Sequence, residues 1–364
     1  MRVLVVNAGS SSVKLSLLEG DTTVHADSVA PGDARDALAT LLESDPAPDA
    51  VGHRVVHGGL DFTGPTVVDD DVLERIAALR TLAPLHQEPS VAALRQARET
   101  RPGIAQVACF DTAFHATLPV AAHTYAVPER WRDELGVRRY GFHGLAHEWA
   151  SRRAAELVDR PLDELRIVTA HLGSGASLCA VERGRSVDTT MGFTPTAGLV
   201  MGSRCGDLDP AVPLWLVARG IEPDEIAEAL DRHSGLLALA GDADTAAVAR
   251  TAADGDRRAV AALDVWAHRA RAHVAAMATA MGGVDVLAFS GGVGEHLPAL
   301  RALAVERLSF LGLALDPDRN GAARGGDADI GAAAAAARAV VVAAREDLVI
   351  AEQVRAVLGS PPAA

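Results

Sequence analysis

Apolar and polar residues follow the same order in two distant stretches of the chain. Arg2–Ser12 is an apolar run that ends in a Gly/Ser loop, and Val13–Leu18 then alternates between apolar and polar positions. Arg166–Ser177 repeats the run and the loop, and Leu178–Val181 repeats the continuation. Short alternating runs joined by small residues are typical of β-hairpins. The pattern therefore predicts two similar hairpins.

The repeat has a constant offset of 164 residues (166 minus 2), which places Gly184 opposite Gly20. Two strand–loop–strand units predict two similar domains, each directing backbone N–H groups from a small-residue loop toward one shared anion, such as a polyphosphate. The alternative is that each loop is an ordinary hairpin turn, because Gly and Ser are common turn residues. The matching register favours duplicated domains.

The rest of the chain predicts a mixed α/β protein. Gly291–Gly294 is expected as a turn after the buried strand 284–290. Ala332–Ala337 is ambiguous, because its propensity favours a helix but a Val-rich strand candidate follows it. The expected strands are 50–57, 105–111, 284–290 and 338–343. The expected helices are 70–82, 90–100, 145–158, 210–219, 223–232, 257–281 and one that begins near Glu346.

Composition narrows the class of protein. A length of 364 residues exceeds the usual size of one hydrophobic core, so two domains are expected. The formal charge of −14 gives no basic surface for nucleic acid or an anionic membrane. The segment Met1–Asn7 turns polar too early for a signal peptide, and no run is apolar enough to span a bilayer, so we expect a cytoplasmic protein. Cys109, Cys179 and Cys205 lack metal-ligand spacing and are expected in the core.

Two arginines stand in segments that suit an anionic ligand. Arg54 lies at the end of an expected strand and precedes a Gly turn, and Arg204 lies in a loop of small residues that lets backbone approach a ligand. A guanidinium matches a carboxylate or a phosphoryl group with two parallel hydrogen bonds. Either arginine alone is more simply interpreted as a surface or salt-bridged residue.

Seven ordered motifs carry a resemblance to one family: residues 7–12 (NAGSSS), 53–59 (HRVVHGG), 110–115 (FDTAFH), 139–144 (RYGFHG), 171–175 (HLGSG), 191–195 (MGFTP) and 204–210 (RCGDLDP). Together they resemble the acetate kinase family, and the similarity runs from the first residues to Ile350. The resemblance implies transfer of the γ-phosphoryl group of ATP to a short carboxylate, with Mg²⁺ or Mn²⁺ as cofactor. It also implies a homodimer, and a link to acetyl-CoA biosynthesis.

The implied fold is α/β: two ribonuclease-H-like domains of the actin-like, sugar-kinase-like (ASKHA) superfold, with a nucleotide cleft between the domains. We expect the N-terminal domain to comprise residues 1–112 plus 347–364, and the nucleotide-binding domain to comprise residues 113–346. Domain closure is expected to accompany catalysis.

The resemblance also assigns roles. It implies catalytic roles for Asp111, His143 and Arg204, and a metal site at Asn7 and Glu346. Substrate contacts are implied for Arg54, which would hold the carboxylate, and for Val56, Leu85, His86, Phe142 and Pro195. Nucleotide contacts are implied for Lys14, His171, Leu172, Gly173, Ser174, Gly175, Asp244, Gly292, Val293, Gly294, Glu295 and His296.

Several of these residues have simpler interpretations. Asp111 could cap a helix, Glu346 could be a first-turn acid that the helix dipole favours, and Phe142 could belong to the core. We expect His57, His115 and His147 to be structural, and we expect no protein-ligated metal site built from histidines, because Mg²⁺ prefers oxygen ligands.

The chain also departs from the family at several positions. Gln87-Glu88-Pro89 stands where Asn-Pro-Pro is usual, and Leu145-Ala146 where Thr-Ser is usual. Ser174 and His296 each replace an asparagine, and the arginine expected after Asp244 is absent. Ala344-Arg345 precedes Glu346 in place of Thr with Asn or Asp, which removes an expected helix cap.

Two rivals to an acetate kinase remain at this stage. One is a propionate or butyrate kinase, since the residues do not settle the preferred acyl chain. The other is an ATP-binding regulator of the same superfold without transfer activity. The arginine implied on the substrate side, Arg54, argues against the regulator, because nucleotide binding alone would not need it.

Overall fold

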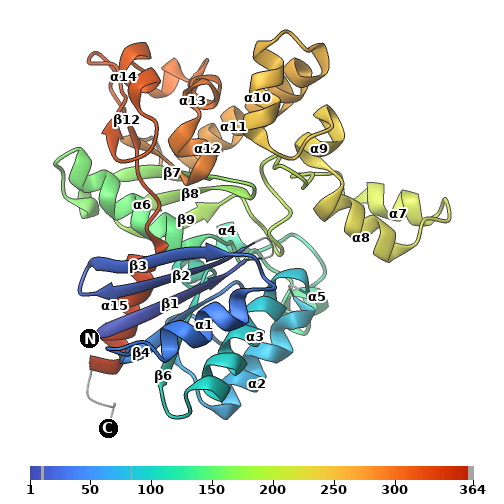
Figure 1. The fold of residues 1–364 in the computed structure, drawn as a ribbon. Coiled ribbons are helices and arrows are strands. Elements are labelled where there is room, and N and C mark those ends of the chain that lie inside the picture. The colour runs from blue at the N-terminus through green and yellow to red at the C-terminus, as the bar shows by residue number, and fades with distance from the viewer. Residues whose placement is uncertain (10–11, 83, 360–364) are drawn as a thin grey trace. The chain divides into compact units, whose positions relative to one another are not determined.

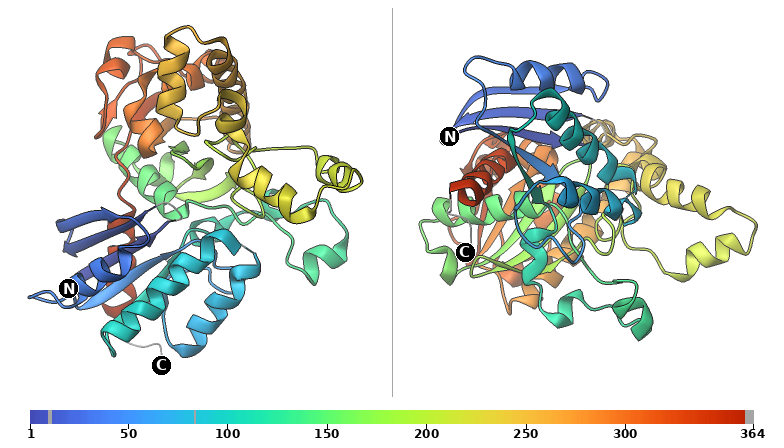
Figure 2. Two further views of the ribbon diagram at one scale, coloured as in Figure 1. Left: turned by 45° about the vertical axis from the view of Figure 1, so that its right-hand side comes forward. Right: turned by 90° about the horizontal axis from the view of Figure 1, so that it is seen from below.

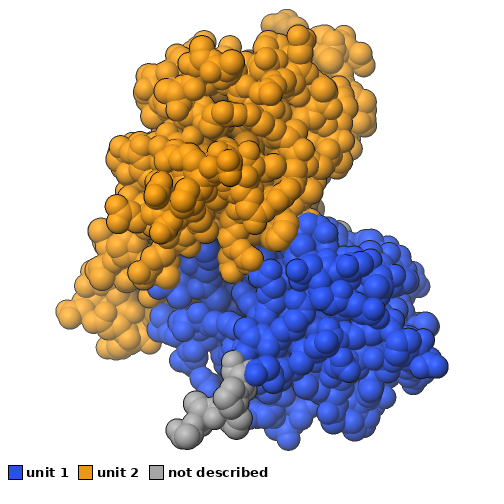
Figure 3. All heavy atoms as spheres, turned by 90° about the vertical axis from the view of Figure 1, so that its left-hand side faces the viewer, with its two compact units in different colours: residues 1–116, 142–145, 345–364 blue, residues 117–141, 146–344 orange. Residues whose placement is uncertain are grey.

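The computed structural model describes residues 1–9, 12–82 and 84–359, without the side chains at 81 and 84–86 (Figure 1). The chain divides into two compact units, residues 1–116 with 142–145 and 345–364, and residues 117–141 with 146–344 (Figure 3). The domain boundaries that the sequence predicts differ from these units chiefly at residues 142–145, and they stay a prediction.

The first unit holds one six-stranded sheet and its helices. Its strands are β1 (Arg2–Ala8), β2 (Val13–Glu19), β3 (Thr22–Val29), β4 (Ala50–Val55), β5 (Thr66–Val67) and β6 (Ala105–Phe110). Its helices are α1 (Ala34–Leu42), α2 (Asp70–Ala78), the 3-10 turn η1 (Leu79–Thr81), α3 (Pro84–Thr100) and α15 (Glu346–Gly359). The 3-10 turn η2 (Ala113–Thr117) lies at the end of the first segment of this unit.

The second unit holds another six-stranded sheet. Its strands are β7 (Arg166–Leu172), β8 (Ala176–Glu182), β9 (Arg185–Thr189), β10 (Val286–Ser290), β11 (Ala328–Asp329) and β12 (Arg338–Val341). Its helices include α4 (Val120–His123), α5 (Glu129–Asp133), α6 (Gly144–Leu157), η3 (Leu162–Glu164), α7 (Ala211–Val217), α8 (Pro223–Arg232) and α9 (Gly235–Ala240). They continue with α10 (Thr245–Ala253), α11 (Arg257–Ala280), α12 (Gly291–His296), α13 (Pro298–Val305), η4 (Ser309–Leu311) and α14 (Pro317–Ala322).

The two sheets share one topology. The first has the strand order β3-β2-β1-β4-β6-β5, and the second, taken in the same direction, has the order β9-β8-β7-β10-β12-β11. In both, three antiparallel strands are followed by two strands parallel to the first, and a short antiparallel strand closes the edge. The predicted fold class of two duplicated α/β domains is confirmed.

The register of the two hairpins differs by one residue. Arg2 pairs with Glu19 and Arg166 with Glu182, so the first strands are offset by 164 residues and the second strands by 163. The second loop is therefore one residue shorter, and the equivalent of Gly20 is Arg183, not Gly184. Both Gly20 and Arg183 have positive φ, at 56° and 53°, as a tight hairpin requires at this position.

Side-chain alternation separates the two faces of the first sheet. Leu4 and Val6 on β1 and Val51 on β4 point toward α1 and α3 and form a core with Leu38 and Leu42. The residues of opposite parity face α15, where a side chain at Gly52 would meet Ile350 and Val354 of that helix. Helices α1 and α3 thus cover one face, and α15 covers the other (Figure 1, Figure 2).

Two sequence expectations need correction, for residues 291–294 and for Cys205, and the open assignment of Ala332–Ala337 is settled. Gly291–Gly294 is the start of helix α12 and not a turn. Ala332–Ala337 is not helical, because its backbone pairs with Gly312 and Ala314 of a neighbouring segment. Cys109 and Cys179 are buried as expected, but Cys205 is only partly buried.

Among the described residues, no helix is both long and apolar enough to cross a membrane.

Candidate active site

Three polar side chains lie at the carboxyl ends of neighbouring parallel strands in the first unit. Asn7 is near the end of β1, Arg54 near the end of β4, and Asp111 follows β6 directly. The pairing of Val6 with His53 aligns Asn7 with Arg54, and Asp111 is two residues beyond the partner of Arg54. Because residues two apart share a face, all three point to the side of the sheet that α15 covers.

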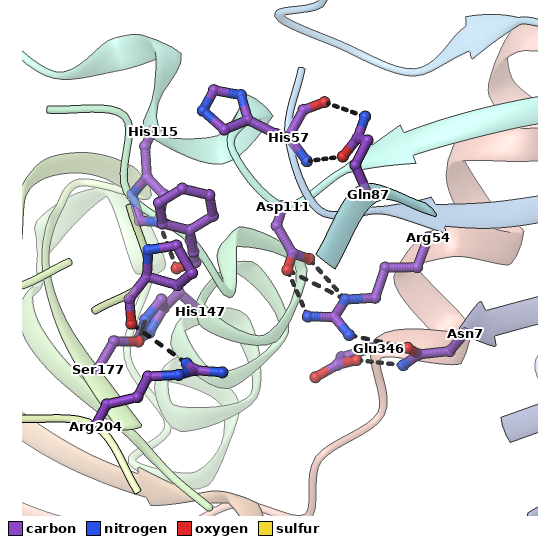
Figure 4. A network of polar contacts seen from close by, with 12 residues as sticks. Asn7, Arg54, His57, Gln87, Asp111, His115, His147, Ser177, Arg204 and Glu346 are labelled. Carbon is purple, nitrogen blue, oxygen red and sulfur yellow. Dashed lines mark hydrogen bonds and ion pairs between the residues drawn. The ribbon is translucent and has the colours of Figure 1, made fainter. Parts of the chain in front are cut away.

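These side chains form one hydrogen-bonded chain (Figure 4). Arg54 donates from Nε to both carboxylate oxygens of Asp111 at 3.0 and 3.1 Å and from Nη2 to Asp111 Oδ2 at 2.5 Å. Arg54 Nη1 donates to Asn7 Oδ1 at 3.0 Å, and Asn7 Nδ2 donates to Glu346 Oε2 at 2.8 Å. We call Asp111, Arg54, Asn7 and Glu346 the carboxylate–arginine network.

The network stabilises the charged form of Arg54 and leaves two of its N–H groups available to a ligand. Burial disfavours the cation, but Asp111 and Glu346 outweigh burial and raise the pKa of Arg54 above its ordinary value. Of the five guanidinium N–H groups, one on each terminal nitrogen has no partner among the described residues. Two such donors on one charged plane can bind a carboxylate with two parallel hydrogen bonds.

His143 belongs to the same unit and has a constrained backbone. Its φ is +58°, a left-handed conformation that costs free energy in a residue with a Cβ atom. The next residue, Gly144, donates its N–H to the Asp111 carbonyl at 2.9 Å, and a Cβ at Gly144 would collide with that oxygen. The backbone of Asp111 therefore holds the turn that carries His143.

The other predicted residues of the first unit differ in exposure. Lys14 is exposed and lies directly across from Asn7 in the β1–β2 pair. Val56 and Phe142 are buried, and the Phe142 ring meets the His57 ring edge-on at 5.4 Å between centroids. The predicted pocket side chains of Leu85 and His86 lie outside the described residues.

Arg204, the other predicted guanidinium, is held in the second unit. Its Nε lies 3.1 Å from Asp231 Oδ1, and its Nη1 donates to the Pro195 carbonyl at 3.3 Å. The side chain is 17% exposed. The ion pair with Asp231 has no signal in the sequence, because the two residues lie on different elements. Pro195 is thereby tied to Arg204 through its backbone.

The predicted phosphate loop of the second unit is a tight turn. Gly173 N–H donates to the Gly175 carbonyl at 2.9 Å, and Gly202 N–H donates to the Ser174 carbonyl at 3.2 Å. His171 pairs with Ser290 across β7 and β10, and its Nδ1 lies 3.2 Å from Ser290 Oγ. The pair is equivalent to Asn7 and Arg54 in the first sheet, so the two sheets place different chemistry at matching strand ends.

Helix α12 carries the glycines predicted to contact the adenosine. Apart from its chain neighbours and the backbone of its own helix, no described atom lies within 4 Å of a Cβ built at Gly292, so this position is open. Glu295 accepts hydrogen bonds at Oε1 from Gly291 N–H at 3.0 Å and from Ala344 N–H at 3.1 Å. In this structure the Glu295 carboxylate therefore orients the turn around Gly291 and the segment before α15.

Sequence reasoning missed Arg301, which is fully buried on α13. Its guanidinium donates to the carbonyls of Gly294 and Glu295 at 2.8 and 3.0 Å, and to three acceptors at Asn320 and Ala323. Burial lowers the pKa of Arg301 to about 10. The available signal was a charged residue within the apolar helix 298–305. Arg301 binds the last carbonyls of α12 and so stabilises a glycine-rich helix.

Two predicted nucleotide residues, Asp244 and His296, have local contacts in the structure. Asp244 caps α10, because its side chain accepts a hydrogen bond from Ala246 N–H at 2.9 Å. His296 is exposed and packs against Gly325. Neither observation identifies a nucleotide contact, and both residues stay predictions.

His115 and His147, expected to be structural, have hydrogen-bond partners inside their own units. His115 Nε2 lies 3.0 Å from the Phe142 carbonyl, and the ring nitrogens of His147 lie 2.7 and 2.8 Å from the hydroxyls of Thr169 and Ser177.

Gln87, one of the departures from the family pattern, accepts a hydrogen bond from the His57 N–H at 3.2 Å and donates one to the His57 carbonyl at 3.1 Å. Gln87 therefore holds the segment that follows Arg54.

Two buried histidines predict acid sensitivity. Burial lowers the pKa of His53 to about 3, against a smaller effect of Gln106, and lowers that of His57 to about 4. Unfolded histidine titrates near 6.5, so below that pH the unfolded state binds more protons and stability falls as pH falls. Each histidine contributes up to about 1.4 kcal/mol per pH unit. Urea midpoints should drop from pH 7 to pH 5.

The control for this prediction is a pair of variants. His53→Gln should reduce the pH slope of the unfolding free energy, whereas the same change at the exposed His25 should not. Equal slopes for the wild type and His53→Gln would contradict the account.

The oxygen atoms of the network suit a hard cation. Within the described part of the chain, no group of three or more His, Cys, Asp or Glu side chains could hold a metal by itself. Mg²⁺ commonly takes one or two protein ligands and completes its shell with water and nucleotide phosphates. Glu346, at the start of α15, and Asn7, near the end of β1, carry such oxygens and are hydrogen-bonded to each other, so these residues fit the ion.

Comparison with known proteins identifies the family of the chain. A model of the acetokinase family matches residues 36–352. Among curated proteins, the chain is 44% identical over 386 residues to an acetate kinase of Leifsonia xyli subsp. xyli, covering 96% of this chain and 97% of that one.

Among solved structures, it is similar to a Porphyromonas gingivalis acetate kinase, with TM-score 0.88, 34% identity and coverage of 98% and 99%. It is also similar to a propionate kinase from Francisella tularensis, with TM-score 0.90, 33% identity and coverage of 97% and 98%. The resemblance seen in the sequence is confirmed, and the chain belongs to the acetokinase family of kinases.

Proposed function

We propose that this protein is a short-chain carboxylate kinase that converts ATP and acetate reversibly into ADP and acetyl phosphate. The observation that carries the proposal is Arg54, a charged guanidinium held by Asp111 and Asn7 that keeps two donors for a carboxylate. The family membership supports the same reaction. An ATP-binding regulator would have no use for a carboxylate site of this kind.

The proposed mechanism is direct in-line transfer. The carboxylate bound by Arg54 is already ionised at neutral pH, so it needs positioning and no strong base. One of its oxygens forms a bond to the γ-phosphorus while the bond from phosphorus to the β-bridging oxygen breaks and ADP leaves. His143 and Arg204 would stabilise charge on the equatorial oxygens. Mg²⁺, when bound at Asn7 and Glu346, would offset the charge of the nucleotide phosphates.

The finer assignments are part of this proposal. They comprise the nucleotide contacts of Lys14, His171–Gly175 and α12. They also comprise a cytoplasmic location, a homodimeric assembly and a link to acetyl-CoA biosynthesis. The domain boundaries 1–112 with 347–364 and 113–346 belong here too.

A panel of short carboxylates tests the activity. Purified protein with ATP and Mg²⁺ should form acyl hydroxamate with acetate and with propionate when hydroxylamine traps the acyl phosphate. A result without hydroxamate for acetate, propionate and butyrate would exclude the kinase proposal. A preference for propionate would favour the propionate kinase alternative, for which the similar Francisella structure provides a precedent.

Chain-length preference should depend on Val56. The side chain is 6% exposed and belongs to the predicted substrate pocket. Val56→Ala enlarges that pocket, and one methylene in a pocket changes binding by about 1–3 kcal/mol. We expect the ratio of kcat/KM for propionate to that for acetate to rise roughly tenfold.

The matched control is Val55→Ala. Val55 is fully buried on the opposite face, in the core with Phe62 and Phe110. Its truncation should lower stability without changing the substrate ratio. An unchanged ratio in Val56→Ala would remove Val56 from the pocket.

Nucleotide selectivity should be looser than in typical relatives. A site rejects the wrong base when polar groups are left without partners, and Ser174 and His296 replace two asparagines of the family pattern. Contacts to the nucleotide phosphates recognise negative charge and do not distinguish one base from another. We expect kcat/KM for GTP within roughly tenfold of that for ATP, a difference of about 1.4 kcal/mol.

Kinetics with ATP, GTP, CTP and pyrophosphate would check this expectation. The open position at Gly292 leaves room for a nucleoside, so pyrophosphate should be a poor donor. A strong preference for ATP over GTP would mean that other residues replace the missing contacts.

A further inference from the structure

Helix α15 begins at Glu346 without a usual capping residue. Arg345 precedes it, and arginine has no side-chain oxygen to accept the first N–H groups of a helix. The structure shows a different device at this point. Arg345 donates to Asp347 from Nε to Oδ1 at 2.9 Å and from Nη2 to Oδ2 at 3.0 Å.

Thr23 on β3 closes this arrangement. Arg345 Nη2 donates to Thr23 Oγ1 at 2.8 Å, and Thr23 Oγ1 donates to Asp347 Oδ2 at 3.4 Å. Three side chains thus form a closed ring that ties the first turn of α15 to the edge of the sheet. We call Thr23, Arg345 and Asp347 the α15 clamp.

Two residues of the clamp directly precede and follow Glu346 in the sequence. Arg345 and Asp347 are its two neighbours, and both are bound to the same threonine. The Glu346 carboxylate accepts the hydrogen bond from Asn7, which in turn accepts one from Arg54. Any rotation of the first turn of α15 would therefore move Glu346 relative to Asn7.

Stability alone does not account for the clamp. Arg345 is 36% exposed and Asp347 18% exposed, and ion pairs this close to solvent contribute little to folding. A fork of two hydrogen bonds does, however, fix direction. Groups that orient a metal ligand in this way often change metal affinity when they are removed.

We propose that the α15 clamp positions Glu346 for the metal–nucleotide complex, replacing the helix cap that this chain lacks. Thr23, Arg345 and Asp347 are positioning residues, because none of them belongs to the carboxylate–arginine network. The inference rests on the proposed function, in which Asn7 and Glu346 serve the metal ion.

The chain contains a matched control. Arg355, near the other end of α15, donates to Asp21 Oδ1 at 3.2 Å and to the Gly20 carbonyl. It ties the same helix to the same β2–β3 hairpin and is 25% exposed, but it is remote in sequence from Glu346. A purely structural tether would act alike at Arg345 and Arg355.

The test compares Arg345→Met, Thr23→Val and Arg355→Met in the full chain. Mn²⁺ binding in the presence of ADP is measured by electron paramagnetic resonance, together with Tm and the Mg²⁺ dependence of kcat. We expect Arg345→Met to weaken Mn²⁺ binding roughly tenfold, the lower end for outer-shell partners of a metal ligand. Thr23→Val should act in the same direction, and Arg355→Met should change only Tm.

Two results would overturn the clamp while leaving the kinase intact. One is normal Mn²⁺ affinity in both Arg345→Met and Thr23→Val, and the other is an equal loss in Arg355→Met. If Arg345→Met does not fold, Mn²⁺ binding by Thr23→Val still tests the proposal. Wild-type protein that binds no Mn²⁺ with ADP and forms no acyl phosphate would instead overturn the proposed function, and this inference with it.

Discussion

Arg204→Ala is expected to lower kcat by roughly 10²-fold or more, the scale for losing one preorganised charge donor at a transition state. The guanidinium is held by Asp231 and by the Pro195 carbonyl, so its position is set before any ligand binds. Nucleotide affinity should change much less than kcat, because the interaction strengthens only as charge develops on the phosphoryl group. Steady-state kinetics and ADP titration measure the two quantities.

Arg271→Ala is the control for that variant. Arg271 has nearly the same exposure, 18% against 17%, and pairs with Glu306 at 2.7 Å in the same unit. Its loss should leave kcat unchanged. Asp231→Asn removes the ion pair but keeps Arg204, and should therefore cost less than Arg204→Ala. A near-normal kcat in Arg204→Ala would remove this residue from the mechanism.

Asp111→Asn is expected to have the second large effect. The carboxylate is 1% exposed and accepts three hydrogen bonds from Arg54. Removing one partner of a buried ion pair costs about 3–5 kcal/mol, because the remaining charge loses its partner. We expect the unfolding free energy to fall by about that amount and kcat/KM for acetate to fall roughly 10²-fold or more, since Arg54 is no longer held in place.

Asp285→Asn separates lost stability from lost function. Asp285 also binds an arginine with two hydrogen bonds, from Arg166 Nε and Nη2 at 3.0 and 3.1 Å, but it lies in the second unit, where the same arginine also donates to the Gly282 carbonyl. This change should lower Tm and leave kcat/KM unaltered. If Asp111→Asn instead kept normal kinetics at a reduced Tm, Asp111 would be a structural residue only.

The sequence predicted the two hairpins because each is a local pattern of alternation around a small-residue loop. Arg54 could also be predicted as a candidate, since it lies near the end of an apolar strand, whereas the role of Asn7 was implied only by the family resemblance. Their contact could not be derived from spacing alone, because it depends on the parallel pairing of β1 with β4. Asp111 joins them through the next strand in the same way.

Tertiary contacts explain one wrong sequence prediction, at residues 291–294, and one that the sequence left open, at Ala332–Ala337. The glycines 291–294 favour a turn by propensity, but Arg301 from another helix binds the Gly294 and Glu295 carbonyls and stabilises α12. Ala332–Ala337 favours a helix by propensity, but hydrogen bonds to Gly312 and Ala314 hold it in an irregular path. The α15 clamp also depends on a tertiary contact that the sequence does not reveal, because Thr23 and Arg345 are far apart in the chain.

The most direct test of the central claim follows both products of the reaction by ³¹P nuclear magnetic resonance. With ATP, Mg²⁺ and acetate, the account predicts ADP and acetyl phosphate in equal amounts, and ATP regained when ADP and acetyl phosphate are supplied instead. ADP with free phosphate would show an ATPase without transfer to the carboxylate. That result, or no turnover with any short carboxylate, would contradict the assignment.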